Sequence, residues 1–491
     1  MRGVRASLAF FVLALGALGA PLLAGCGVDE AVNPAPGSIF WEACGGGFEC
    51  AEFAVPVDHD APGGASFTLP LLRLRAARPE ARVGSLLVNP GGPGGSGVAW
   101  VRSGAARLPQ AIRDRFDVVG FDPRGAAGSE PSIDCIDDIG AFARLDLTPD
   151  DEAERQAIVD ETDAMVAGCA ARMEGILPFV GTDRVARDMD LLREALGDEA
   201  LTYLGFSYGT LLGAVYAELF PERVRALVLD GAVDPTLPGE VAMAEQGLAF
   251  EEQLGDFLAD CAVDAACAFH GAGDPAGVYD LIQSEVEISP LPASGDRRLG
   301  PGEMMYGVSL SLYRPSRWPR LAEALMLAAL DGDGSGLLDL ADSYLERDPS
   351  GSYGDGLEVY YAVISLDGPF ARDVSVYQAL TDELAIEAPR LGAYFPYSAL
   401  PGARWPVAPW RDAAPIAAEG APPILVVGTT RDPATPYGWS VSLAAQLASG
   451  VLLTREGQGH TAFLKGNDCI DAAVTAYLVE GAAPEDGAVC P

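Results

Sequence analysis

Short apolar runs alternate along the chain with segments whose apolar residues recur at helical spacing. We therefore predict buried strands at 85–89, 116–122, 201–204, 226–230, 424–428 and 451–454. Helices are predicted at 153–174 and 185–196, between two of these strands. This alternation is typical of an α/β fold that has a mostly parallel sheet with helices on both of its faces.

Two parts of the chain depart from this alternation. Residues 44–77 alternate between apolar and polar positions, as antiparallel strands do. Between Asp234 and about Pro415 the strand signals disappear, and helices are predicted at 241–262, 301–313 and 318–330. We therefore expect a helical cap at 235–415, inserted between the two parts of an α/β core at 39–234 and 416–491.

The first 25 residues have the pattern of an export signal. Two arginines precede an apolar run at 8–23, which is short and close to the terminus for a membrane-spanning helix. The run ends in Leu-Ala-Gly-Cys26, which resembles the bacterial lipobox, where the cysteine becomes the lipidated first residue. We expect a signal peptide at 1–25 and a lipidated flexible tether at 26–38 that anchors the exported protein to a bacterial membrane in the cell envelope. An ordinary secretory signal is the alternative, and it would leave the protein secreted.

Cysteine usage fits an exported protein. Apart from Cys26 there are eight cysteines, an even number, and an oxidising compartment favours disulfides. Eight cysteines allow many pairings, and proximity in the sequence favours Cys44–Cys50, Cys135–Cys169, Cys261–Cys267 and Cys469–Cys490.

Composition and charge narrow the class of partner. The chain has 491 residues, of which 49% are hydrophobic, and its formal net charge is −38. An acidic surface repels phosphate backbones, so we expect no nucleic-acid partner, and cationic substrates would be weakly attracted. The sequence does not indicate an oligomeric state.

The segment Gly205-Phe206-Ser207-Tyr208-Gly209 directly follows a predicted strand and precedes a helix expected from Leu211. In a Gly-x-Ser-x-Gly turn between strand and helix, the glycines allow a strained backbone that exposes the serine hydroxyl. This context predicts that Ser207 is a nucleophile.

A serine nucleophile needs a base, and the chain has three histidines. His59 lies among the N-terminal strands and His270 in the expected cap, whereas His460 follows the last predicted strand. For the acid, Asp432 lies four residues after a predicted strand in a short polar loop, and Asp230, at the end of another strand, is the competing candidate. We favour His460 and Asp432, which gives the chain order Ser, Asp, His of α/β-hydrolases.

A glycine-rich run at 92–97 follows the first buried strand and has two interpretations. It fits the Gly-x-Gly-x-x-Gly pattern of a dinucleotide site, for which Asp122 would be the ribose-binding acid. Alternatively, it is an oxyanion loop, in which the backbone N–H groups of Gly92 and Tyr208 stabilise a developing alkoxide. Two prolines in the turn and the Gly-x-Ser-x-Gly motif favour the second interpretation, so we expect no cofactor.

Acidic residues at 331–342 resemble a calcium loop of the EF-hand type, although the last position is Asp rather than Glu. A turn between two helices, with an acid capping the second helix, explains the same residues. An isolated copy favours the turn, so we expect no metal.

Taken together, these motifs resemble the tripeptidyl aminopeptidase-like branch of α/β-hydrolase serine peptidases, which is related to proline iminopeptidases. The resemblance spans 41–490 and rests on blocks at 55–58, 89–97, 116–125, 205–210, 228–231, 432–436 and 459–460. It implies an α/β-hydrolase fold, and it implies that Ser207, Asp432 and His460 form a catalytic triad. It also implies a peptide substrate that is cleaved near its free amino end.

The chain departs from this family in the cap. Many relatives have two cap cysteines where this chain has Ser365 and Gly402-Ala403, which is consistent with one absent disulfide. Two other functions stay open: a secreted carboxylesterase of the same fold, and a binding lipoprotein that has lost catalysis. The intact triad argues against the second of these, because a protein that has lost catalysis usually loses the serine or the histidine first.

Overall fold

The computed structural model describes residues 39–491, so the expected signal peptide, the tether and Cys26 lie outside the described residues. A ten-stranded sheet has the order β1-β2-β3-β5-β4-β6-β7-β10-β11-β12. The strands pair in parallel from β5 to β12, and β1, β2 and β3 extend the sheet antiparallel to its edge. The predicted mostly parallel sheet is therefore confirmed. The strands are β1 (Glu42–Ala43), β2 (Phe48–Pro56), β3 (Ser66–Leu74), β4 (Gly84–Asn89), β5 (Phe116–Phe121), β6 (Leu201–Phe206), β7 (Val224–Asp230), β10 (Ile424–Arg431), β11 (Gly450–Gln458) and β12 (Ala488–Cys490).

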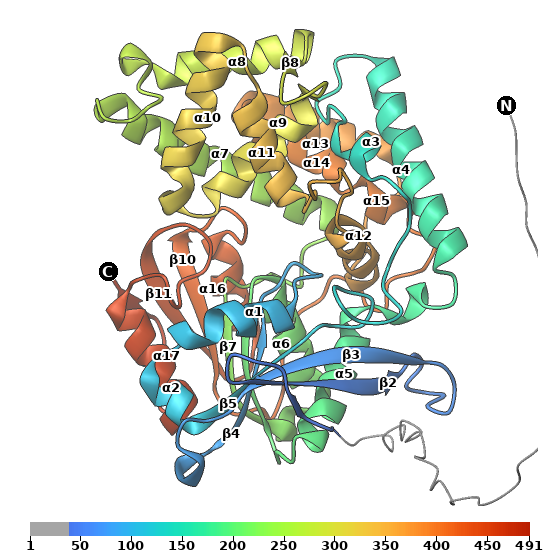
Figure 1. Ribbon diagram of the computed structural model, residues 1–491, viewed down its shortest axis with the longest axis vertical. Helices are drawn as coiled ribbons and strands as arrows, with labels where there is room; N and C mark the ends of the chain where they lie inside the picture. The colour runs from blue at the N-terminus through green and yellow to red at the C-terminus, as the bar shows by residue number, and fades with distance from the viewer. Residues whose placement is uncertain (1–38) are drawn as a thin grey trace, which may run out of the picture. The chain divides into compact units, whose positions relative to one another are not determined.

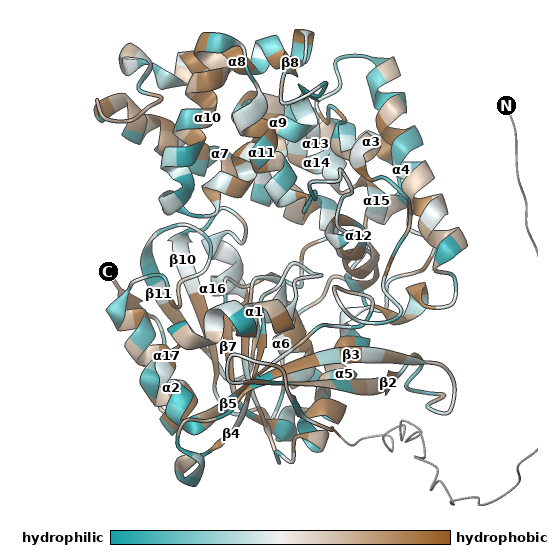
Figure 2. Ribbon diagram, in the orientation of Figure 1, coloured by the Kyte–Doolittle hydropathy of each residue, from teal (hydrophilic) through white to brown (hydrophobic). Residues whose placement is uncertain are grey.

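Helices cover both faces of this sheet because successive side chains of a buried strand point to opposite sides. In β4, Leu86 and Val88 pack in a cluster with residues of α1, α2 and α17. Leu87 lies between them in the sequence and packs in a second cluster with α5, α6 and α16. Figure 2 shows hydrophobic residues concentrated on the central strands and mixed with hydrophilic ones along the helices.

The helices nearest the sheet are α1 (Gly97–Gly104), α2 (Gln110–Arg115), α5 (Thr182–Ala195), α6 (Tyr208–Leu219), α16 (Tyr437–Gln446) and α17 (Asp468–Glu480). Further helices are α3 (Gly140–Ala143), α4 (Glu152–Arg172), α7 (Gly239–Val263), α8 (Pro275–Ile288), α9 (Pro301–Leu312), α10 (Trp318–Asp331), α11 (Ser335–Tyr344), α12 (Gly356–Asp367), α13 (Val374–Glu387), α14 (Phe395–Ser398) and α15 (Leu400–Arg404).

The regular secondary structure between β7 and β10 is helical except for a short hairpin of β8 (Leu291–Pro292) and β9 (Arg298–Leu299). Its helices gather at one end of the sheet, in the upper part of Figure 1. Apart from α12, whose buried residues belong to the cluster that contains Leu87, they share a hydrophobic cluster that also contains Ala143, Leu147 and Ile158. The segment that carries α3 and α4 therefore packs with these helices, although it precedes β6 in the chain (Figure 1).

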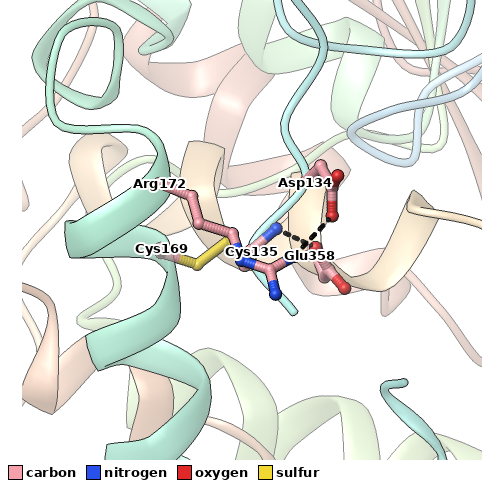
Figure 3. Close-up of a disulfide and its surroundings, with 5 residues drawn as sticks. All are labelled: Asp134, Cys135, Cys169, Arg172 and Glu358. Atoms are coloured by element: carbon pink, nitrogen blue, oxygen red, sulfur yellow. Dashed lines mark hydrogen bonds and ion pairs between the residues drawn. A yellow bond between two sulfur atoms is a disulfide. The ribbon is translucent and has the colours of Figure 1, made fainter. Parts of the chain in front are cut away.

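Four disulfides join Cys44–Cys50, Cys135–Cys169, Cys261–Cys267 and Cys469–Cys490. The structure thus brings the eight cysteines together in the pairs that sequence proximity favours. Cys135–Cys169 links the segment after β5 to α4, and Figure 3 shows Glu358 of α12 beside it. The backbone N–H of Cys135 donates to Oε2 of Glu358 at 2.5 Å. Burial raises the pKa of Glu358 to about 7.

Within residues 39–491, no helix is both long enough and apolar enough to span a membrane.

Candidate active site

Ser207 occupies the turn between β6 and α6. Its backbone has φ 55° and ψ −127°, a conformation that non-glycine residues rarely adopt. The backbone carbonyl of Asp230 in β7 accepts a hydrogen bond from the Ser207 N–H at 2.9 Å, and the Ser207 carbonyl accepts from the N–H and hydroxyl of Thr210. Neighbouring elements therefore hold the strained serine in place.

Close backbone approach explains the two glycines of this turn. A Cβ on Gly205 would lie 2.4 Å from the carbonyl oxygen of Gly209, and a Cβ on Gly209 would lie 2.9 Å from Oδ1 of Asn89. Because real Cβ atoms do not approach other atoms so closely, side chains at these positions would displace the turn or its neighbours.

His460 and Asp432 are directly bound to each other. Nδ1 of His460 lies 2.9 Å from Oδ1 and 3.0 Å from Oδ2 of Asp432. The buried carboxylate also accepts hydrogen bonds from the backbone N–H groups of Ala434, Thr435 and Thr461. A carboxylate on Nδ1 favours the tautomer with its proton on that nitrogen, which leaves Nε2 available as a base.

Asp230, the competing acid, has a different place. It is fully buried beneath the loop after His460 and accepts hydrogen bonds from the backbone N–H groups of Ala462 and Phe463. Burial raises the pKa of Asp230 to about 6. Through its hydrogen bonds to Ala462 and Phe463, Asp230 holds the loop after His460, and it makes no hydrogen bond to the imidazole.

The cap supplies a contact to His460 that the sequence analysis missed. The carbonyl of Tyr313 accepts a hydrogen bond from the His460 N–H at 2.9 Å, and the two rings meet edge to face with centroids 5.4 Å apart. Tyr313 directly follows α9 and belongs to no motif, so no sequence signal distinguishes it from the other aromatic residues of the cap.

Ser207 and His460 line the same cavity, whose volume is about 650 Å³. Its floor consists of loops at the carboxyl ends of β4, β6, β10 and β11, where ligands bind in open α/β sheets. Cap side chains form the opposite wall, with aromatic residues prominent: Phe250, Tyr306, Tyr313, Tyr344, Tyr360, Tyr361 and Phe395. Such a concave site, which combines aromatic side chains with polar and charged groups, is suited to a small molecule or a peptide.

The glycine-rich run forms the loop between β4 and α1. Gly92 has φ +112° and lines the cavity together with Ser207. Tyr208 is the first residue of α6, so its N–H has no acceptor within the helix. Tyr208 thus directly follows the serine, and Gly92 lines the same cavity.

The same loop also satisfies the chain topology of a dinucleotide site, because α1 begins at the last glycine and Asp122 follows β5. However, the Asp122 carboxylate is buried and accepts hydrogen bonds from the Ser96 hydroxyl and from the N–H groups of Val98 and Gly128. A carboxylate occupied in this way is not available to a ribose, so the oxyanion interpretation fits better.

The other two histidines lie elsewhere. Nε2 of His59 contacts Asp188 at 3.0 Å beside the buried Arg124, and Nδ1 of His270 contacts the carbonyl of Cys261 at 2.9 Å. Neither residue lines the cavity that contains Ser207.

The acidic segment at 331–342 is a turn between two helices. Gly332, with φ +61°, ends α10, and Oδ1 of Asp333 accepts a hydrogen bond from the N–H of Ser335 at the start of α11. Asp342 binds Arg297 with contacts of 2.5 and 2.8 Å. Within the described part of the chain, no group of three or more His, Cys, Asp or Glu side chains is placed to hold a metal.

Asp367, a buried carboxylate at the end of α12, is a candidate for binding an ammonium group, but its oxygens already have partners in the fold. It accepts hydrogen bonds from the N–H and hydroxyl of Thr182 and from the indole of Trp410. Burial raises its pKa to about 6. Asp367 lines a smaller cavity of about 150 Å³ that also contains Ser207, whereas Glu346 and Asp355, which the sequence analysis did not single out, line the large cavity.

Comparison with known families gives two matches. Residues 388–490 match the family described as TAP-like protein, and residues 84–272 match the alpha/beta hydrolase fold. The second match confirms the predicted fold class.

Comparison with curated proteins gives relatives that span nearly the whole chain. Serine protease Hip1 of Mycobacterium tuberculosis is 39% identical over 91% of this chain and 88% of its own length. Carboxylesterase B of the same species is 36% identical over 100% of this chain and 98% of its own. Tripeptidyl aminopeptidase of Streptomyces lividans is 33% identical over 92% of this chain and 86% of its own.

Proposed function

Because this chain belongs to the TAP-like family of α/β hydrolases, which are serine hydrolases, we propose that it is an exported aminopeptidase. It releases short peptides or residues from peptide N-termini through an acyl-enzyme on Ser207. The observation that carries the proposal is the contact of His460 Nδ1 with Asp432 at 2.9 Å, on the wall of the cavity that contains Ser207.

In this mechanism Nε2 of His460 removes the proton from the Ser207 hydroxyl as Oγ attacks the substrate carbonyl. Asp432 orients the ring and stabilises the imidazolium cation. The backbone N–H groups of Gly92 and Tyr208 bind the oxyanion, and loss of one such donor typically costs about 10²–10³-fold in rate. The carbon–nitrogen bond then breaks and His460 gives its proton to the leaving amine. Water releases the acyl group by the reverse proton transfers.

A pair of cap carboxylates supports an aminopeptidase over a carboxylesterase. Glu346 and Asp355 line the cavity, and within residues 39–491 neither forms an ion pair with an arginine, lysine or histidine. Gly356, the neighbour of Asp355 in the chain, lies beside the oxyanion loop, since a Cβ on Gly94 would be 3.6 Å from its carbonyl oxygen. Burial, with the nearby charge of Glu346, raises the pKa of Asp355. Two neighbouring carboxylates without a cation are suited to bind the ammonium group of a peptide.

The test is a panel of peptide amides with a free amino end, the same peptides acetylated, and simple esters, with Ser207→Ala as the inactive control. We expect the free peptides to be cleaved at least about tenfold faster than the acetylated ones, because a charge-assisted contact contributes about 1.5–3 kcal/mol. Hydrolysis of esters without any hydrolysis of peptides would favour the carboxylesterase instead. No turnover of any substrate would favour a binding lipoprotein.

We further propose that Cys26 carries a lipid that anchors the protein in the bacterial envelope, which the lipobox-like sequence before it supports. The test is extraction of cell envelopes, with Cys26→Ser as the control. Release of the wild-type protein into buffer without detergent would contradict the anchor.

A further inference from the structure

Four cations gather on the wall of the cavity that contains Ser207: Arg107, Arg314, Arg317 and Lys465. We call this group the cationic wall. The chain has 32 lysines and arginines against 70 aspartates and glutamates, so most basic groups have acids nearby. Within the described residues, however, no carboxylate forms an ion pair with any of these four side chains. Their positive charge is therefore available to a ligand.

The charges of the cationic wall act on one another. Burial, followed by the nearby charge of Arg314, lowers the pKa of Lys465 to about 8, and Arg107 and Arg455 contribute in the same direction. Asp230 opposes this shift, but its carboxylate lies beneath the loop and is bound to the N–H groups of Ala462 and Phe463. Mutual repulsion among cations without partners is relieved when an anion binds.

The cationic wall lies next to His460. Lys465 is on the loop that follows His460, which places both side chains on the same cavity wall. Arg314 directly follows Tyr313, whose carbonyl and ring both contact His460. An anion held by Arg314 and Lys465 is therefore adjacent to the catalytic base, within the reach of about one or two extended residues, at about 3.3–3.6 Å each.

The proton transfer from His460 to the leaving amine determines which part of a peptide substrate lies beside the cationic wall. In the proposed function, His460 gives its proton to the leaving amine, so the leaving portion of the peptide has to lie against His460. The two carboxylates Glu346 and Asp355 belong to the cap segment beside the oxyanion loop, and they would hold the opposite, amino end. The cavity thus carries a pair of acidic groups on the cap segment and a group of basic side chains on the cationic wall.

We propose that the cationic wall binds the free C-terminal carboxylate of the leaving portion, so that the preferred substrates are short peptides that end within a residue or two of the scissile bond. This inference rests on the proposed function. It predicts that the enzyme cleaves peptide fragments in preference to the N-termini of folded proteins.

Because of the net charge of the chain, a preference for peptides with a free C-terminal carboxylate over peptide amides would indicate a local cationic site. At −38, the molecule as a whole repels an anionic substrate and slows its association. Without a local site, a peptide with a free carboxylate is therefore a poorer substrate than its C-terminal amide. With the cationic wall, the order is reversed.

The experiment compares kcat/KM for matched short peptides with a C-terminal carboxylate or a C-terminal amide. We expect wild-type protein to favour the carboxylate roughly tenfold or more, the size of one charge-assisted hydrogen bond. In the double variant Arg314→Gln, Lys465→Gln the ratio should fall to about one or below, and Lys465→Arg should keep it. Arg102→Gln is the matched control, because Arg102 is exposed on α1 and does not line the cavity. Its ratio should equal that of the wild type.

Equal or faster cleavage of the amide by wild-type protein would overturn the inference, and so would an unchanged ratio in the double variant. A parallel pair of acetyl esters, with 4-hydroxybenzoate or 4-hydroxybenzamide as the leaving group, separates this result from the proposed function. If peptides are not cleaved but the carboxylate ester is favoured in the same pattern, the peptidase proposal fails and the anion site stands.

Discussion

At the scale of single residues, two buried aspartates near the loop that carries His460 have different roles. Asp432 binds Nδ1 of His460 through both of its oxygens, whereas Asp230 binds the backbone two and three residues further along. Spacing after a strand favoured Asp432 and kept Asp230 as a competitor. The sequence could not assign Asp230 to the loop, because that contact depends on how β7 and the histidine loop meet in space.

Substitution of the two aspartates by asparagine should separate these roles. Asp432→Asn places an amide against Nδ1 and favours the wrong tautomer, so we expect kcat to fall by about 10³–10⁴-fold. Asp230→Asn keeps one acceptor oxygen for the loop and should lower kcat by less than about tenfold. Steady-state kinetics on one peptide substrate checks both values. Equal losses in the two variants would contradict the assignment of Asp432 as the partner of the base.

Asp230 should also make stability depend on pH. Its pKa is raised from the ordinary 3.8 to about 6 in the folded protein, so folding favours the protonated acid. The contribution of the protonated Asp230 to stability is therefore fully present below the unfolded-state pKa of about 3.8 and is lost as the pH rises through about 6. Relative to Asp230→Asn, the wild-type free energy of unfolding should fall by up to about 3 kcal/mol between about pH 4 and pH 7. Denaturant unfolding of both proteins measures this, and a constant difference would contradict it.

At the scale of elements, the candidate active site lies where β6, the glycine-rich loop and α6 meet. The sequence motifs located all three. The helix nevertheless begins at Tyr208, three residues before the expected Leu211, because Ser207 alone makes the turn. The hairpin β8–β9 and the strand β12 were not predicted. Each of these three strands has only two or three residues, and such short strands are defined by their partners in space, not by a periodic pattern.

Gly91 tests how tightly these elements are fitted together. Its φ is +94°, and a Cβ there would lie 2.5 Å from the carbonyl of Phe206 and 2.9 Å from the Cβ of Ser207. Gly91→Ala should therefore shift the serine and lower kcat/KM by about 10²-fold, the usual cost of a displacement of about 1 Å. Gly438→Ala in α16 is the matched control, since a Cβ there meets nothing within 4 Å, and it should keep full activity. Full activity of Gly91→Ala would contradict a close fit between the glycine-rich loop and the turn at Ser207.

At the scale of the whole molecule, the function proposed depends on two layers that enclose one cavity. The sheet layer, with Ser207, Asp432 and His460, follows recurrent motifs, and its fold class was predicted correctly. The cap wall was not predictable in the same way. The cationic wall combines residues from three distant parts of the chain, Arg107, Arg314–Arg317 and Lys465, and no linear pattern marks them. Their shared position arises only when the cap helices pack over the carboxyl ends of the strands (Figure 1).

The proposed chemistry begins with a single nucleophile, so the decisive measurement is the mass of the intact protein after reaction with a fluorophosphonate. This reagent forms a stable phosphonyl ester with an activated serine. We predict one adduct per wild-type chain, located by peptide mapping on Ser207, and no adduct on Ser207→Ala that has the same melting temperature. A wild-type protein that remains unlabelled, or a Ser207→Ala protein that is labelled equally, would contradict Ser207 as the nucleophile.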